Sequence, residues 1–376
     1  MKKGVSEILE YSRYRGNESA QSRVIYFLSD RKEWKNCSIK MQSEGIRPIR
    51  YLRQLGMIVA DNPNESIQLK NYPQIIYKES DIRIKITKPL VENLPNRKVQ
   101  QVPWGVQRIK APEVWPWSRG QGVRVAIVDT GISSKHPAIW ANYRGGVNIL
   151  SPRFAPDDYN GHGTHVAGII AGRAEKMNIL GVAPRVSIYA VKAFDRRGVA
   201  NLSDLLSAID WCIEQKVDVI NMSFGMGQVS ELLRYAVQKA HQRGITMVAA
   251  TGNRSQKDQI DFPAQYPETI AVCSVSENGS LSSFGNLGNG VDIAAPGEKI
   301  QSAWLNQTTR VMSGTSMAVP HVVGTIALML QFQKNLNPEQ IRYLLLHATE
   351  RIEGMEKIGM VNALRAMQLL QRNNRY

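Results

Sequence analysis

Cysteine is scarce in this chain of 376 residues. The three cysteines, Cys37, Cys212 and Cys273, are an odd set, so they cannot all pair into disulfides. They lie in apolar or mixed surroundings and are not spaced like the ligands of a metal site. The sequence therefore excludes a small disulfide-stapled fold and predicts three reduced thiols.

A long hydrophobic run is also missing. No stretch approaches the roughly 18 uninterrupted apolar residues of a membrane-spanning helix, and the best candidate, residues 322–332, is better explained as a buried helix. Residues 1–17 mix lysine, arginine and glutamate and contain no apolar core of roughly 7 to 15 residues, which a secretory signal needs. We therefore expect no membrane association and a cytoplasmic protein. The alternative is a secreted protein whose export segment lies upstream of this sequence.

Charge is not concentrated in one part of the chain. The formal net charge is +15, of which +8 falls on residues 1–98 and the remainder on the rest. The chain has no run of lysine and arginine interleaved with aromatic residues, which is typical of nucleic-acid binding. A solvated basic surface explains the charge, and we expect no nucleic-acid partner.

Prolines mark a domain boundary. Pro89, Pro95 and Pro103 flank a polar stretch, residues 92–101, that cannot easily continue a helix or a strand. We therefore divide the chain into an N-terminal domain, residues 1–98, and a larger domain, residues 99–376. In the first domain, short strands are expected at residues 24–29, 57–60 and 75–84, which indicates a small α+β unit.

The larger domain alternates apolar strands with amphipathic helices. Near-continuous apolar runs predict strands buried on both faces, at residues 123–128, 187–191, 217–222, 245–250 and 269–275. Residues 202–215 and 229–243 place apolar side chains at helical spacing, and Gly244 lies where a helix would end. This alternation predicts an α/β fold with a doubly wound, mostly parallel sheet. Functional residues collect at the carboxyl ends of the strands in such a sheet.

Asp129 stands at one of these strand ends. The apolar run at residues 125–128 stops at this carboxylate, and a glycine, Gly131, follows it closely. A strand-end Asp can be catalytic, but it is more often a helix cap or a turn former. The motif alone therefore leaves the role of Asp129 open.

His162 lies between two glycines at the start of a predicted helix of small residues. Glycine on both sides allows a close approach of backbone and substrate. His165 follows three residues later, so the two histidines could instead bind a metal, but no glutamate lies between them as in H-E-x-x-H. We expect His165 to be a packed core histidine.

Ser316 is predicted at the N-terminus of a helix, where unpaired backbone N–H groups can face an anion. The alternative is that Ser316 only caps this helix, and Pro320 is expected in its first turn. Asn253 follows another strand and carries an amide that can donate a hydrogen bond. A catalytic serine needs a base, a carboxylate that orients the base, and donors for an oxyanion. The sequence contains all four groups.

Together these segments resemble the subtilisin family of serine proteases, over about residues 99–370. The resemblance rests on the DTG, HGTHVAG, ATGN and GTSMAVPH segments, which occur in the family's chain order of Asp, His and Ser. It implies that Ser316 attacks the peptide carbonyl, His162 moves the proton, Asp129 orients the imidazole and Asn253 helps to bind the oxyanion. The implied activity is that of an endopeptidase acting on extended peptides and proteins, without a catalytic cofactor.

The same resemblance implies a substrate-binding cleft. Two extended edges would pair with the substrate backbone, formed by Ser223, Phe224 and Gly225 on one side and by Gly198, Val199 and Ala200 on the other. Asp261 would lie at the base of the primary specificity pocket. A buried carboxylate needs a partner, which would be either a substrate Lys or Arg, or a neighbour such as Arg254 or Lys257.

Residues 24–90 resemble, more weakly, the family's propeptide, a folding aid and inhibitor. The alternative is an unrelated N-terminal domain. Because Lys98 ends a basic stretch at the proposed boundary, we expect self-cleavage after it, which would agree with a preference for basic residues.

The family's usual calcium site looks incomplete. Gln100 and Glu175 could be remnants of it, but Ala138 occupies the position where the family has a carboxylate. Calcium prefers 6 to 8 oxygen ligands, several of them anionic. We therefore expect a weakened or lost structural calcium site.

Two other functions fit the same segments. A scaffold that binds peptides without cleaving them would usually lack one of the three catalytic residues, and all three are present here. An acyltransferase could use the same serine on a different acceptor. Of these functions, the endopeptidase is the one that uses every motif.

Overall fold

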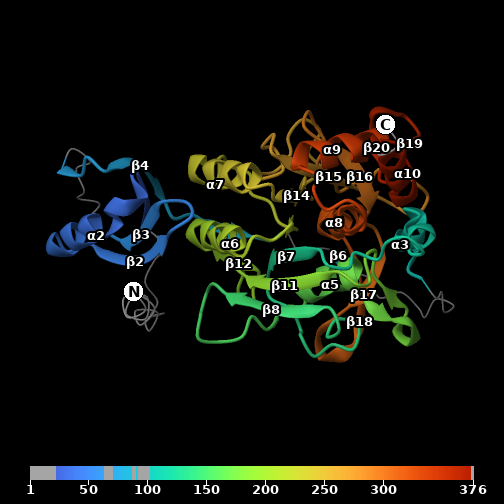
Figure 1. Cartoon of the computed structure of the whole chain (residues 1–376), viewed down its shortest axis with the longest axis horizontal. Helices are drawn as coiled ribbons and strands as arrows, with labels where there is room; N and C mark the ends of the chain where they lie inside the picture. Colours follow the sequence, from blue (N-terminus) through green and yellow to red (C-terminus); the bar gives the residue numbers. More distant parts are fainter. Residues whose placement is uncertain (1–22, 63–70, 87–89, 92–101, 374–376) are drawn as a thin grey trace.

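The computed structural model describes residues 23–62, 71–86, 90–91 and 102–373. Figure 1 shows a small N-terminal unit at one end of the molecule and a larger unit with a central sheet beside it. The N-terminal unit is a four-stranded antiparallel sheet in the order β2-β3-β1-β4. Its strands and its helix are β1 (Arg23–Leu28), β2 (Arg47–Leu52), β3 (Met57–Asp61), β4 (Ile75–Ser80) and α2 (Trp34–Ser43).

Side chains on β1 alternate between two cores. Tyr26 and Leu28 pack with Cys37 and Met41 of α2 in a core that belongs to the N-terminal unit. Ile25, on the opposite face, belongs to a core shared with the larger unit. Because successive residues of a strand point to opposite faces, one short sheet packs against α2 on one face and against the larger unit on the other.

The larger unit confirms the predicted α/β fold. Its nine-stranded sheet has the order β19-β20-β16-β15-β14-β13-β7-β11-β8, and every pairing is parallel except that of β19 with β20. The strands are β7 (Arg124–Asp129), β8 (Tyr143–Asn148), β11 (Ser187–Lys192), β13 (Val219–Met222), β14 (Thr246–Ala250), β15 (Thr269–Val275), β16 (Ile293–Pro296), β19 (Glu350–Ile352) and β20 (Met355–Met360).

Helices cover both faces of this sheet. On β7, Val125 and Ile127 pack in the core that contains α5 (His162–Ala171) and α8 (Thr315–Phe332). Ala126 and Val128 pack in the core that contains α6 (Leu202–Gln215) and α7 (Glu231–Gln242). The remaining helices of four or more residues are α3 (Trp104–Arg108), α4 (Ala111–Val114), α9 (Pro338–His347) and α10 (Ala363–Asn373). The double winding explains why the strands read as unbroken apolar runs.

α8 is the one helix in the described residues that is long and apolar enough to cross a membrane. In the structure 89% of its 18-residue window is buried, and it packs against β13, β14, β15 and β16. This agrees with the expected core helix, although the helix begins seven residues earlier than the apolar run that predicted it.

The run at residues 75–84 is not the single strand that we expected. β4 ends at Ser80, and β5 (Arg83–Lys85) pairs with a strand of the larger unit, β12 (Val199–Asn201). The break falls at Asp81, whose carboxylate accepts hydrogen bonds from the backbone N–H and the hydroxyl of Ser203, both at 2.7 Å. An apolar run does not reveal that its two halves join different sheets.

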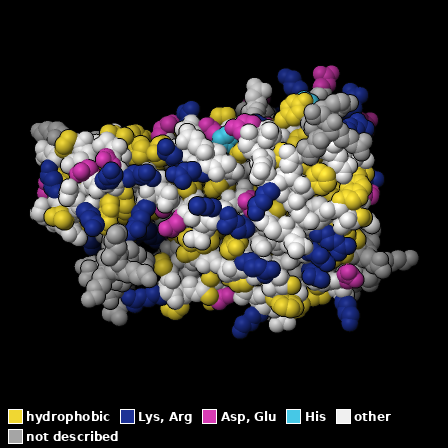
Figure 2. Space-filling model, in the orientation of Figure 1, with side chains coloured by type: hydrophobic (Ala, Val, Ile, Leu, Met, Phe, Trp, Pro, Cys, Tyr) yellow, Lys and Arg dark blue, Asp and Glu magenta, His cyan; other side chains and the backbone are white. Residues whose placement is uncertain are grey.

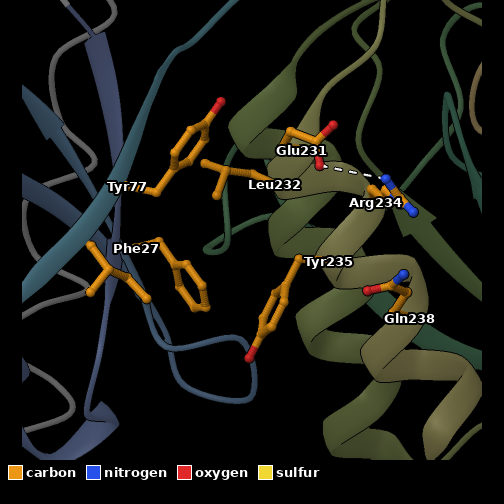
Figure 3. Close-up of a pocket in the computed structure, with 8 residues that line it drawn as sticks. Phe27, Tyr77, Glu231, Leu232, Arg234, Tyr235 and Gln238 are labelled. Atoms are coloured by element: carbon orange, nitrogen blue, oxygen red, sulfur yellow. Dashed lines mark ion pairs between the residues drawn. The ribbon is translucent and has the colours of Figure 1, made fainter.

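The N-terminal unit docks on α6 and α7. Figure 3 shows Phe27 and Tyr77 of the small sheet facing Leu232 and Tyr235 of α7, and the rings of Phe27 and Tyr235 lie 4.4 Å apart between centroids. Glu79 accepts a hydrogen bond from the N–H of Leu232 at 3.2 Å. Asp81 and Glu79 therefore cap two helix N-termini across the interface, where negative charge is favourable.

In other polar contacts the N-terminal unit supplies the donor and the larger unit the acceptor. Asp210 of α6 accepts hydrogen bonds from the backbone N–H groups of Gln54 and Leu55, at 2.7 and 3.0 Å. Burial raises the pKa of Asp210 to about 6, although these N–H groups oppose the shift. Arg50 forms an ion pair with Asp204 at 2.8 Å. The interface thus combines a shared apolar core with satisfied polar groups.

Lysine and arginine are spread over both units on the face shown in Figure 2. Hydrophobic and acidic side chains lie between them. This distribution agrees with the even division of positive charge along the chain and with a solvated basic surface.

Candidate functional site

Asp129 and His162 are presented by sharp turns at the carboxyl edge of the large sheet. Asp129 is the last residue of β7, and Gly131 follows with φ of +110°. Gly161 precedes α5 with φ of +104°, and a Cβ at this position would lie 2.4 Å from the ring of Trp304. Both glycines are needed, because a side chain would be strained there and would collide with its neighbours.

The carboxylate of Asp129 contacts the imidazole of His162 directly. Nδ1 of His162 lies 2.8 Å from each carboxylate oxygen, and both residues are buried. Oδ1 of Asp129 also accepts the N–H of Thr130 at 2.7 Å, which fixes the carboxylate. Burial opposes the charged form of His162, but the charge and hydrogen bond of Asp129 outweigh it and raise the pKa of the imidazole. The pair is arranged to accept a proton at Nε2 of His162.

Ser316 is the second residue of α8, where a backbone N–H has no partner within the helix. Its hydroxyl donates to the carbonyl of Ser223 at 2.9 Å, and the hydroxyl of Ser223 donates to the carbonyl of Ser316 at 3.0 Å. Two reciprocal hydrogen bonds therefore hold the start of α8 against the segment that follows β13.

Pro320 explains why the Ser316 carbonyl is free to accept that bond. We expected Pro320 in the first turn of the helix, but it is the sixth residue of α8. In that position its missing N–H removes the bond that the carbonyl four residues earlier would accept. The hydroxyl of Ser223 replaces it. The expectation about Pro320 was wrong because a helix that begins at Thr315, next to Ser316, has Pro320 in its second turn.

The structure does not join Ser316 to His162 by a hydrogen bond. The Ser316 hydroxyl points to Ser223, and Nε2 of His162 has no hydrogen-bond partner within the described part of the chain. Catalytic hydrogen bonds are often long or misaligned before substrate binds. For Ser316 to give its proton to His162, its side chain must first rotate away from the carbonyl of Ser223.

Asn253 lies close to the start of α8. Its Oδ1 accepts hydrogen bonds from the N–H and the hydroxyl of Thr315, at 2.9 and 2.8 Å. These bonds use the acceptor end of the amide, so Nδ2 is the end left to donate to a ligand. Asn253 and the N–H of Ser316 are thus two donors next to the same serine, as the sequence predicted.

Two segments of the chain itself run along this site. β5 pairs antiparallel with β12, and the N–H of Ile86 donates to the carbonyl of Gly198 at 2.9 Å. β6 (Leu90–Val91) pairs with β18 (Thr309–Ser313), with Leu90 opposite Ser313. β12 contains Val199 and Ala200 of the predicted substrate edge, and β18 ends three residues before Ser316.

The other predicted edge is placed differently. Ser223 is hydrogen-bonded to Ser316. The rings of Phe224 and Phe194 pack with their centroids 5.1 Å apart. A Cβ on Gly225 would lie 2.5 Å from the Cβ of Asp261. The sheet that contains β5 has only β12 as its second strand in the described residues. Pairing of residues 223–225 with a substrate therefore stays a prediction.

Asp261 is fully buried and already has a cationic partner. Its Oδ1 accepts a hydrogen bond from the guanidinium of Arg254 and another from Nδ2 of Asn286 at 3.2 Å. Its Oδ2 is buried and has no hydrogen-bond partner in the described residues. Burial raises the pKa of Asp261, and Arg254 opposes this shift. Of the two partners left open by the sequence, the structure contains the neighbour Arg254.

The described residues do not fit a calcium site at the position considered above. Gln100 lies outside the described residues. Glu175 is exposed at the start of a 3-10 helix (Glu175–Met177), and Ala138 is buried with a methyl group where a carboxylate is needed. No group of three or more His, Cys, Asp or Glu that could hold a metal occurs in the described part of the chain.

The second histidine of the motif is a packed residue. Nε2 of His165 lies about equally far from the carbonyls of Ile300 and Arg310, at 3.1 and 3.0 Å, and the residue is fully buried. Burial lowers the pKa of His165 to about 3, so it stays neutral. One charged residue near the site, Asp158, escaped the sequence analysis because it carries no motif.

Comparison with known proteins gives a consistent result. The model of the subtilase family matches residues 120–370. Subtilisin NAT from Bacillus subtilis subsp. natto is 38% identical over 280 residues, covering 73% of this chain and 70% of that protein. Subtilisin Savinase from Lederbergia lenta is 39% identical over 267 residues, covering 70% and 98%. A cold-adapted subtilisin-like serine proteinase of known structure is 33% identical, with a TM-score of 0.64 over 70% of this chain and 99% of that one.

The residues matched by the family model form most of the larger unit and include Asp129, His162, Asn253 and Ser316. Subtilases act on peptide and protein substrates and need no catalytic cofactor. Because the family model covers more than half of the chain and the relatives exceed 30% identity over most of their length, the chain belongs to the subtilase family and is a serine endopeptidase that hydrolyses peptide bonds.

Proposed function

We propose that the enzyme cleaves peptides through an acyl-enzyme formed on Ser316. In this mechanism Oγ of Ser316 attacks the carbonyl carbon, and Nε2 of His162 takes the hydroxyl proton. The amine leaves with that proton. Water then attacks the ester while His162 takes its proton, and His162 returns this proton to Oγ of Ser316 as the carboxylic acid product leaves. Asp129 holds the imidazole in the tautomer with its proton on Nδ1 and stabilises the imidazolium.

The contact between Asp129 and His162 is the observation that carries this proposal. A buried carboxylate 2.8 Å from Nδ1 is the arrangement that a general base needs. Asn253 Nδ2 and the N–H of Ser316 would bind the oxyanion of the tetrahedral intermediate, where fixed donors stabilise developing charge.

The test combines loss of function with detection of the intermediate. Ser316→Ala should have no peptidase activity and should leave the full chain unprocessed. The parent, quenched in acid during turnover of an ester substrate, should carry the acyl group on the peptide that contains Ser316, seen by mass spectrometry. Peptidase activity in purified Ser316→Ala protein would contradict the proposal.

We further propose that the N-terminal unit inhibits the enzyme and that residues 82–86 and 90–91 occupy the cleft as a substrate would. The pairing of β5 with β12, which contains part of the predicted substrate edge, and of β6 with β18, which ends three residues before Ser316, supports this. Ile84 and Ile86 are buried in the core shared with the larger unit, as side chains held in binding pockets would be.

This arrangement favours a cleavage point other than Lys98. Lys98 lies outside the described residues, so the structure does not test the boundary that we expected there. We propose instead that self-cleavage falls between Ile86 and Leu90, because Ile86 bonds to Gly198 at the predicted substrate edge and Leu90 pairs with Ser313, three residues before Ser316. N-terminal sequencing of the self-processed protein decides between the two: a new terminus at Val99 would support cleavage after Lys98.

A further inference from the structure

A second buried carboxylate, Asp158, lies four residues before His162. Its side chain accepts five hydrogen bonds and the residue is only 6% exposed. Oδ1 accepts from the Thr130 hydroxyl and from the N–H groups of Asn160 and Gly161, all at 2.9 Å, and Oδ2 accepts from the N–H and hydroxyl of Thr164, at 3.0 and 2.7 Å. So many donors to one carboxylate fix its position and orientation.

These donors come from the two elements that carry the catalytic pair. Thr130 follows Asp129 at the end of β7, and Thr164 lies in the first turn of α5, two residues after His162. The hydroxyl of Thr130 also accepts the N–H of Gly163 at 3.0 Å. Asp158 therefore fixes the end of β7 to the start of α5 through side-chain bonds, and their relative position sets the distance between Asp129 and His162.

Lys192 adds the opposite charge to this region. It ends β11, next to β7, and is 5% exposed. Its ammonium donates to the carbonyl of Thr130 and lies 5.4 Å from the centre of the Tyr159 ring. Burial lowers the pKa of Lys192, and the carboxylates of Asp158, Asp129, Asp195 and Asp157 oppose this shift.

The charges around His162 can therefore be counted. Asp129 and Asp158 both favour the imidazolium, and His165 stays neutral. With neutral His162, the buried groups Asp129, Asp158 and Lys192 carry one net negative charge, because two carboxylates face one ammonium. Protonation of His162 during catalysis makes this set neutral. In a buried site, where charges are poorly screened, such a balance favours the protonated form.

We propose that Asp158 is a positioning residue of this peptidase, which fixes the geometry of Asp129 and His162 and, together with Lys192, balances the charge that His162 gains during the reaction. The inference rests on the proposed role of His162 as the base. It assigns a function to two buried charged residues that do not touch the substrate.

The decisive test compares two variants with opposite effects on charge. Asp158→Asn keeps the shape but removes the negative charge and several acceptor sites. We expect kcat to fall by about 100-fold, as misplacement of catalytic groups by about 1 Å can cost, with little change in KM. The acidic limb of the pH profile of kcat/KM should move to lower pH by about one unit, because His162 loses a neighbouring negative charge. Lys192→Met should move the same limb to higher pH.

Asp157→Asn is the matched control. It removes a carboxylate one residue away that is half-buried and acts more weakly on Lys192. We expect nearly parental kcat and an unshifted limb. Each protein is used after self-processing, or after treatment with immobilised parental enzyme that is then removed. Titration with a fluorophosphonate counts the active molecules, so a folding defect is not mistaken for slow chemistry.

Thr130→Val and Thr130→Ser give a second route if Asp158→Asn does not fold. Only the valine removes the hydroxyl that joins Asp158 to the N–H of Gly163, so only Thr130→Val should lower kcat. The proposal is overturned if Asp158→Asn keeps kcat within threefold of the parent, or if the limbs of Asp158→Asn and Lys192→Met move in the same direction. Failure of the fluorophosphonate to label the parent at Ser316 would instead refute the proposed function.

Discussion

Arg254→Ala should destabilise the protein and change its substrate preference. Asp261 is 0% exposed, and Arg254 is its cationic partner, while Asn286 supplies one further hydrogen bond. Gly225 and Gly252 lie against the carboxylate, since a Cβ on them would lie 2.6 and 2.5 Å from its Oδ2. These glycines belong to the two segments that carry Ser223 and Asn253, so the carboxylate lies beside the predicted substrate pocket.

The size of the effect follows from burial. Removing one partner of a fully buried ion pair costs about 3–5 kcal/mol, whereas exposed pairs contribute about 1 kcal/mol or less. The Arg254 side chain is 41% exposed and that of Asp261 is 0% exposed, so water screens only one end of the pair. We expect the free energy of unfolding to fall by about 1–3 kcal/mol at neutral pH.

The loss should depend on pH in a defined direction. Burial already raises the pKa of Asp261, and removal of Arg254 raises it further. A carboxyl group whose pKa is higher in the folded than in the unfolded protein takes up a proton on folding, so its stability contribution is lost as pH rises through the folded pKa. The difference in unfolding free energy between Arg254→Ala and the parent should therefore shrink as pH falls from neutral towards 5.

Paired peptide substrates test the effect on specificity. With Arg254 gone, a substrate Arg before the cut bond can neutralise Asp261, and the ratio of kcat/KM for Arg over Phe substrates should rise about tenfold, the equivalent of about 1.4 kcal/mol. Arg254→Ala combined with Asp261→Asn should lose this gain. An unchanged ratio in Arg254→Ala, together with parental stability, would refute the reasoning.

Three further predictions concern other parts of the site and its inhibitor. Asn253→Ala should lower kcat by about 100- to 1,000-fold at nearly constant KM, the size known for loss of this amide in subtilisin. A comparable weakening of substrate binding, seen as a raised KM, would argue against an oxyanion role. Met317 is buried directly after Ser316, so peroxide should inactivate the enzyme by forming the sulfoxide, and Met317→Leu should resist it; equal sensitivity would point to another residue. Asp81→Asn weakens the cap on α6 at Ser203, so activity should appear about fivefold sooner after self-cleavage, in line with the roughly 1 kcal/mol value of a helix cap; an unchanged lag would contradict the capping role.

The sequence predicted the elements whose local pattern matches their environment. The strand before Asp129 and the helix at residues 202–215 were found because apolar runs and helical spacing reflect burial on the large sheet. The candidate catalytic residues could be named because each lies in a short segment typical of one family. Their approach in space, as between Asp129 and His162, followed from the rule that strand ends meet at one edge.

Contacts between distant segments escaped prediction. Nothing in the local sequence indicates that Asp81 breaks a strand in order to cap α6, or that residues 83–85 leave one sheet for another. Asp158 was missed for a similar reason: one of its five donors, the Thr130 hydroxyl, lies on a distant segment and reaches it only after β7 and α5 are packed. Arg254 illustrates the remaining gap, since sequence proximity to Asp261 suggested a pair but not which cation would form it.

The place of Ser316 on α8 has a consequence for timing during synthesis. Ribosomes add about 5–20 residues per second, so the interval between the emergence of His162 and of Ser316 is on the order of 8 to 30 s. Throughout that interval the nascent chain carries a base without a nucleophile. β1 to β4, which form the N-terminal sheet, leave the ribosome before any of the catalytic residues. The N-terminal unit, which we propose to be the inhibitor, is therefore synthesised well before the peptidase is complete, so an inhibitor of this kind would be present from the moment the nucleophile appears.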